Sequence, residues 1–150
     1  MGSISDKVLR RFGTRKAFIY FLEIVAQVIV VVFFRSVLPS FWLSFIDNQA
    51  GCCALLKGYG RDDVVNHLLS FTGSLLAKHA STPHFHFVPS DLNVADSISR
   101  GDDSDAVRLH WQRVHLDLHA FEDLLLLVAD DLHFATTNAV DMALQLALNF

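Results

Sequence analysis

Charged residues and cysteines are scarce in this sequence, and each shortage excludes classes of protein. Charged side chains make up 19% of the 150 residues and the net charge is −4, so the broad positive surface of a nucleic-acid-binding protein is not visible overall. The two cysteines, Cys52 and Cys53, are adjacent, so they form no ordinary disulfide framework, and no second pair completes a zinc site. Residues 1–14 are polar and lack the cleavage site of a signal peptide. We therefore expect an intracellular protein, cytoplasmic or nuclear, in which both cysteines are small core-facing residues.

Several catalytic motifs are also missing. Residues 58–60 (GYG) lack the Lys-Ser/Thr that follows in a phosphate-binding loop, and no serine or cysteine lies in a recognisable nucleophile elbow. His84 and His86 share one face of a predicted strand but have no third metal ligand. His115 and His119 lack the HExxH context of a zinc protease. We expect all four histidines to be surface residues.

Hydrophobic residues, in contrast, are abundant at 52% of the chain, with a mean hydropathy of +0.36. Residues 17–34 hold 16 apolar residues out of 18, and Glu23 and Gln27 interrupt this run one helical turn apart, on a shared face. A carboxylate inside a membrane-spanning helix costs about 2.5–3.5 kcal/mol and usually implies a function. The pattern leaves two structures open: the span of a small single-span membrane protein, or a buried helix of an α/β domain with one polar face at a site.

The apolar composition also fits a domain fragment whose exposed faces were made for a partner, such as the missing part of a longer polyprotein. A non-catalytic interaction module is therefore a third alternative.

The order of predicted elements indicates an α/β fold. The pattern predicts a short helical turn at 6–11, helices around 15–37, 49–57, 62–80 and 92–100, strands around 41–46 and 84–88, and helices throughout 104–150, one of them at 121–134. Two strands joined through a helix should lie parallel. We expect a polar lead-in at 1–14, an α/β domain at 15–100 and a helical extension at 101–150.

Three acidic residues occupy positions suited to chemistry. Glu23 lies in the middle of the apolar helix, Asp47 directly follows a predicted buried strand, and Asp96 begins the helix after the second strand. Open α/β sheets place their ligands at the carboxyl ends of strands. A strand-end aspartate is, however, more often a helix cap than a ligand.

Short motifs around these carboxylates form a recognisable series. Residues 45–48 (FIDN) are followed by 54–59 (ALLKGY), and residues 88–90 (VPS) are followed by 93–96 (NVAD) and then by Ser99-Arg100. The run at 19–26 (IYFLEIVA) supplies the helical glutamate.

Over residues 15–100, this series resembles the ribonuclease H-like domain of retroelement reverse transcriptase polyproteins, of the tyrosine-recombinase and gypsy-like types. In that retrotransposon family, four carboxylates hold two Mg²⁺ ions that serve hydrolysis of the RNA strand of an RNA–DNA hybrid. The resemblance implies that Glu23 is the helix ligand, Asp47 the strand-end ligand and Asp96 the final-helix ligand. It also implies that the apolar helix packs against a sheet, with no membrane involved.

The sequence departs from the family at its start. The family's first aspartate lies on a strand before the glutamate helix, within three antiparallel strands, whereas only residues 1–14 precede the helix here. We therefore expect an incomplete, N-terminally truncated ribonuclease H-like fold with little or no hydrolase activity. Mg²⁺-dependent cleavage of a hybrid that Asp47→Asn abolishes would contradict this expectation.

Overall fold

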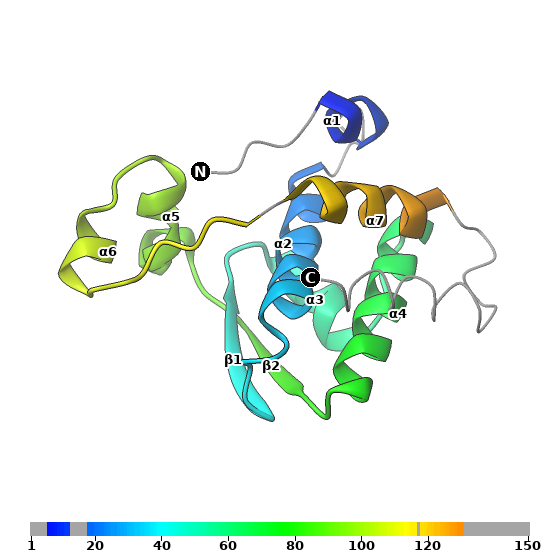
Figure 1. The fold of residues 1–150 in the computed structure, drawn as a ribbon, viewed down its shortest axis with the longest axis horizontal. Coiled ribbons are helices and arrows are strands. Elements are labelled where there is room, and N and C mark those ends of the chain that lie inside the picture. The colour runs from blue at the N-terminus through cyan, green and yellow to red at the C-terminus, as the bar shows by residue number, and fades with distance from the viewer. Residues whose placement is uncertain (1–5, 13–17, 117, 131–150) are drawn as a thin grey trace.

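The computed structural model describes residues 6–12, 18–116 and 118–130, which form a mixed α/β arrangement (Figure 1). The helices and strands, in chain order, are α1 (Asp6–Phe12), α2 (Phe18–Phe34), β1 (Phe41–Ile46), α3 (Gln49–Lys57), α4 (Asp63–Lys78), β2 (Thr82–Phe87), the 3₁₀ turn η1 (Ser90–Leu92), α5 (Val94–Ser99), α6 (Ser104–Arg108) and α7 (Leu118–Asp130).

The two strands form a parallel pair, as predicted for strands joined through helices. In the register of the pair, Ser44 lies opposite Phe85. Alternate residues of β1 face opposite sides: Ser44 and Ile46 are buried, whereas Phe41 and Phe45 are about 60% exposed (64% and 59%). The prediction that 41–46 is a fully buried strand was therefore wrong for its outer face, because no described element covers that side of the sheet.

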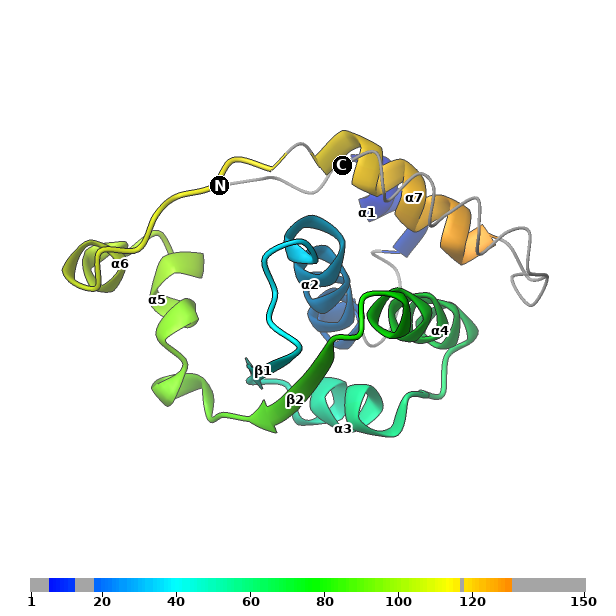
Figure 2. The same ribbon diagram turned by 60° about the horizontal axis from the view of Figure 1, so that its bottom comes forward.

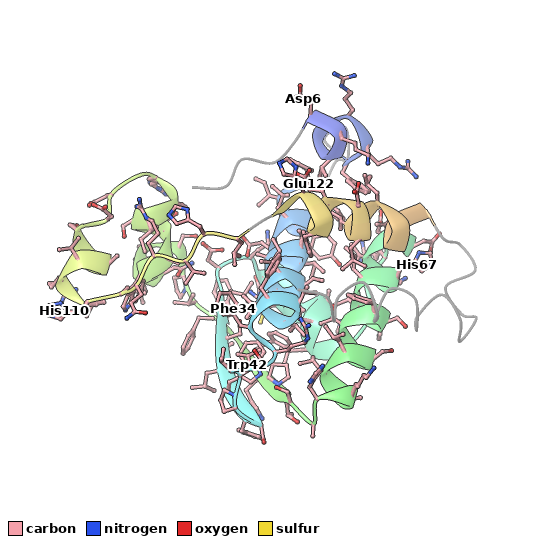
Figure 3. All side chains as sticks on the ribbon, viewed as in Figure 1. Asp6, Phe34, Trp42, His67, His110 and Glu122 are labelled. Atoms are coloured by element: carbon pink, nitrogen blue, oxygen red, sulfur yellow. The ribbon has the colours of Figure 1, made fainter. Side chains whose placement is uncertain are left out.

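The outer face of the sheet also carries the two strand histidines. His84 packs its ring 4.3 Å from that of Phe41, and His86 lies 6.1 Å from Phe45, measured between ring centroids. Both histidines are exposed, as predicted. On the inner face, the indole of Trp42 (Figure 3) donates a 3.0 Å hydrogen bond to Ser81 Oγ.

The core lies between α2, α4 and α7, with α1, α3 and the inner face of the sheet closing it. Figure 1 shows α7 crossing α2 and α4, and Figure 2 shows it on one side of both helices. Side chains that are at most 3% exposed fill this core: Val8, Phe12, Phe21, Ile24, Val28, Val31, Val32, Ile46, Cys52, Val65, Leu68, Phe71, Leu75, Phe121, Leu124 and Leu125. Helix α2 therefore owes its apolar sequence to packing on several sides.

None of the helices in the described ranges combines the length and apolar character that a membrane span requires.

Helices α5 and α6 lie to the side of the sheet, apart from the packed helices (Figure 1), and His110 marks the far end of this segment (Figure 3). The prediction of helix throughout 104–150 was wrong at 109–116, where a turn at 109–110 leads into residues without regular structure. His110 has a φ of +55°, and the Trp111 amide bonds back to the Ala106 carbonyl at 2.8 Å, so the chain leaves α6 in a left-handed turn. Residues 131–150 of the predicted extension lie outside the described residues.

Candidate functional site

The helix α2 places Glu23 against the start of α3. A β-carbon added at Gly51 would lie 3.3 Å from Cβ of Glu23, which is tighter than ordinary van der Waals contact. The absence of a side chain at Gly51 therefore lets α3 approach α2 at the level of Glu23.

Strand β1 places Asp47 at its carboxyl end, directly before α3. The cap of α3 is the next residue: Asn48 accepts a 2.9 Å hydrogen bond from the Gly51 amide through its Oδ1. A strand-end aspartate often serves as a helix cap, and here Asn48 takes that task. The carboxylate of Asp47 is thereby left for other partners.

The carboxyl groups of Glu23 and Asp47 lie close enough to interact electrostatically and, when Glu23 is protonated, to share a hydrogen bond. The pKa of Glu23 is raised above its ordinary value, chiefly by burial, then by the negative charge of Asp47 and by the hydrogen bond to it. Within the described part of the chain, no basic side chain pairs with either carboxylate. Two carboxylates in contact without a cation either share a proton or repel one another.

Asn93 is a third member of this site that the sequence interpretation did not single out. Its Nδ2 donates a 3.1 Å hydrogen bond to Oδ2 of Asp47, and its Oδ1 caps α5 by accepting from the Ala95 amide at 3.1 Å. The capping position before a short helix was the signal available in the sequence. The hydrogen bond from Asn93 to Asp47, which joins residues 46 positions apart, could not be seen in the sequence.

Asp96, the third predicted ligand, points to a different partner. Its Oδ2 forms a 2.8 Å ion pair with Arg100, the residue four positions later that caps the end of α5. Among the residues that the structure describes, no three His, Cys, Asp or Glu side chains gather closely enough to hold a metal ion. The structure thus brings together Glu23 and Asp47 and leaves Asp96 outside the pair.

The second polar residue of α2 has a structural partner of its own. Gln27 is buried, and its Oε1 accepts a 2.7 Å hydrogen bond from Oγ of Ser44 in β1. The polar face that Glu23 and Gln27 share is therefore the face that meets β1 and its carboxyl end.

The expectation for the two cysteines was half right. Cys52 is buried, and burial raises the pKa of its thiol. Cys53 is exposed. Successive helical residues are rotated by about 100° from one another, so both side chains of an adjacent pair on α3 do not face the same core.

Comparisons of this chain with protein-family models, with curated proteins and with solved structures found no match.

Proposed function

We propose that this chain is a remnant of a ribonuclease H-like domain in which Glu23 and Asp47 bind a divalent metal ion. We also propose that it has little or no hydrolase activity by itself. One observation carries the proposal: a glutamate from α2 and an aspartate at the end of β1 meet, and no basic side chain among the described residues pairs with either of them. These are the helix and strand-end positions that the resemblance assigns to metal ligands.

The donor set is suited to magnesium. Mg²⁺ prefers oxygen ligands, and proteins often bind it through one or two carboxylates while it keeps several water molecules. In the described residues Glu23 and Asp47 provide such a pair, and Asn93 fixes the orientation of Asp47 through the bond to Oδ2. In the intact family the metal activates water and stabilises the leaving oxygen of the RNA strand.

The low activity that we propose follows from the position of Asp96, the third predicted metal ligand. Two-metal hydrolysis requires several carboxylates around two ions about 3.5–4 Å apart. Asp96 lies outside the Glu23–Asp47 pair and forms a 2.8 Å ion pair with Arg100, so two of the three predicted carboxylates come together among the described residues. A single weakly held ion lacks the second site that this mechanism uses.

Thermal unfolding with increasing MgCl₂ tests the metal site. We expect Mg²⁺ to raise the midpoint of unfolding of the unmodified chain, because an ion that binds only the folded state stabilises it by mass action. Glu23→Gln and Asp47→Asn should each abolish this response. Asp63→Asn is the matched control, because it removes one exposed carboxylate at the start of α4 and should leave the response intact.

Cleavage of a labelled RNA–DNA hybrid tests the second half of the proposal. We expect no Mg²⁺-dependent product from the unmodified chain. Cleavage that Asp47→Asn abolishes would contradict low activity while supporting the metal site. An equal Mg²⁺ response in Glu23→Gln, Asp47→Asn and the unmodified chain would overturn the metal site itself.

A further inference from the structure

A second site lies along α3, from Ala50 to Lys57, where helices α2, α3 and α4 leave a pocket of about 820 Å³. Its deep part is apolar: Phe21 and Val65 are almost completely buried, and Ala54 is 5% exposed. The small side chains of Ala50 and Ala54, one helical turn apart on α3, leave the space open. A pocket of this size and character suits a small organic molecule rather than a bare ion.

Two cations stand at the rim of this pocket. Lys57 lies in the last turn of α3 and Arg61 lies in the loop before α4; both are exposed. Among the described residues neither forms an ion pair. Among the described residues of the lining, one is a carboxylate, that of Asp62, which caps α4 by accepting from the Val65 amide at 3.2 Å. Two cations and one carboxylate leave a net positive charge, so the rim favours an anionic group.

Two tyrosines complete the lining. Tyr20 comes from α2 and is partly buried, whereas Tyr59 comes from the loop after α3 and is 62% exposed. Gly58, with a φ of +73°, turns the chain sharply after α3 and so brings Tyr59 back to the pocket. An exposed aromatic ring near an apolar floor offers a stacking surface for another aromatic ring.

We propose that this pocket binds an aromatic ring that carries an anionic group, the chemistry of a nucleotide. The ring enters the apolar part beside Tyr20 and Tyr59, and the anion is held by Lys57 and Arg61. The nucleotide is either free in solution or one unit of a single strand. The inference does not rest on the proposed metal site, since none of the pocket residues is a proposed metal ligand.

Cys53 provides a built-in reporter, because its exposed thiol lines the pocket while the neighbouring Cys52 is buried. The experiment measures the rate of N-ethylmaleimide alkylation at Cys53 by mass spectrometry, with EDTA present so that no metal contributes. We expect saturating adenosine 5′-monophosphate to slow alkylation several-fold, and adenosine and ribose 5-phosphate to protect much less. A short oligonucleotide that protects at far lower concentration than the mononucleotide would identify a strand as the source.

Variants of the pocket residues test where the protecting nucleotide binds. The exposed double variant Lys57→Ala/Arg61→Ala should weaken nucleotide binding at least about tenfold, as expected for lost charge-assisted contacts, and Tyr59→Ala should weaken it less. Lys78→Ala removes an exposed cation outside the pocket. In this variant the nucleotide should slow alkylation of Cys53 as much as in the unmodified chain. Equal alkylation rates with and without nucleotide would overturn the proposal. So would full protection in the double variant, or equal protection by ribose 5-phosphate, which lacks the ring.

Discussion

Ser44 in β1 donates a 2.7 Å hydrogen bond to Gln27 in α2, and both side chains are buried. Asp47 comes three residues after Ser44, directly after β1, and Glu23 comes four residues before Gln27 in α2. The helix and the strand therefore run in opposite directions at this contact. The bond fixes how α2 lies along β1. It thereby contributes to placing Glu23 beside Asp47. The Ser44–Gln27 pair is structural, whereas the Glu23–Asp47 pair forms the candidate site.

Removing this bond should reduce stability. Ser44→Ala leaves the buried amide oxygen of Gln27 without its hydrogen-bond donor, which costs about 1–3 kcal/mol of unfolding free energy. The double variant Ser44→Ala/Gln27→Leu should recover part of the loss, because neither polar group then remains buried. Urea unfolding of the two single variants and the double variant measures the coupling, and strictly additive losses would show that the bond contributes nothing.

The Glu23–Asp47 contact should make stability depend on pH. The folded-state pKa of Glu23 is raised, so the folded chain binds this proton more tightly than the unfolded chain. The stabilisation is fully present below the ordinary glutamate pKa and is lost as pH rises through the folded-state value. Urea unfolding without metal, from about pH 4 to pH 8, should show this decline.

Glu23→Gln provides the control for the pH dependence. Its amide donates to Asp47 without adding a negative charge, so the variant should be about 1 kcal/mol more stable than the unmodified chain at neutral pH and should lack the decline assigned to Glu23. An identical pH profile in the variant and the unmodified chain would contradict the assignment to Glu23.

Two glycines should respond to alanine in opposite directions. Gly58 ends α3 with a φ of +73°, a conformation that costs a side-chain-bearing residue about 1–2 kcal/mol, so Gly58→Ala should destabilise. Gly73 lies within α4, and a β-carbon there meets nothing within 4 Å. Gly73→Ala should therefore stabilise by about 0.5–1 kcal/mol through helix propensity. Chemical unfolding of both variants checks the two signs.

Asn93→Asp should add a third carboxylate to the site. The new side chain keeps an oxygen for the Ala95 amide and so preserves the cap of α5, but it no longer donates to Asp47. Without metal the variant should be less stable because of charge repulsion. Its Mg²⁺ affinity, measured by calorimetry, should rise. An unchanged affinity would place the metal away from Asp47.

The sequence predicted the elements whose ends carry local signals. Helix α3 was predicted at 49–57 from the end of the preceding strand and from the glycines at 58 and 60, and the structure adds Asn48 as its cap. Strand β2 begins at Thr82, two residues before its predicted start, and therefore includes Pro83. It is tolerated because β2 lies at the edge of a two-stranded sheet, where one side needs no hydrogen-bond donor.

The candidate site was predicted in part. The positions of Glu23 and Asp47 follow from a helix periodicity and a strand end, both of which are local patterns. The role of Asn93 could not be predicted, because it depends on a hydrogen bond to Asp47, which is distant in the sequence. Outside the site, the turn at His110 was missed because a non-glycine residue adopts a positive φ there. Asp96 was assigned to the site from a motif, whereas its pairing with Arg100 follows from the i,i+4 spacing on α5.

The metal site is tested most directly by adding Mn²⁺ to the ¹⁵N-labelled chain and recording which amide signals broaden, because Mn²⁺ replaces Mg²⁺ at oxygen sites. We predict that the amides of Asp47, Asn48 and Gly51 broaden first, and that Asp47→Asn abolishes this broadening. Broadening that centres instead on the exposed acidic residues at 102–105, with Asp47 and Gly51 unaffected, would contradict the account.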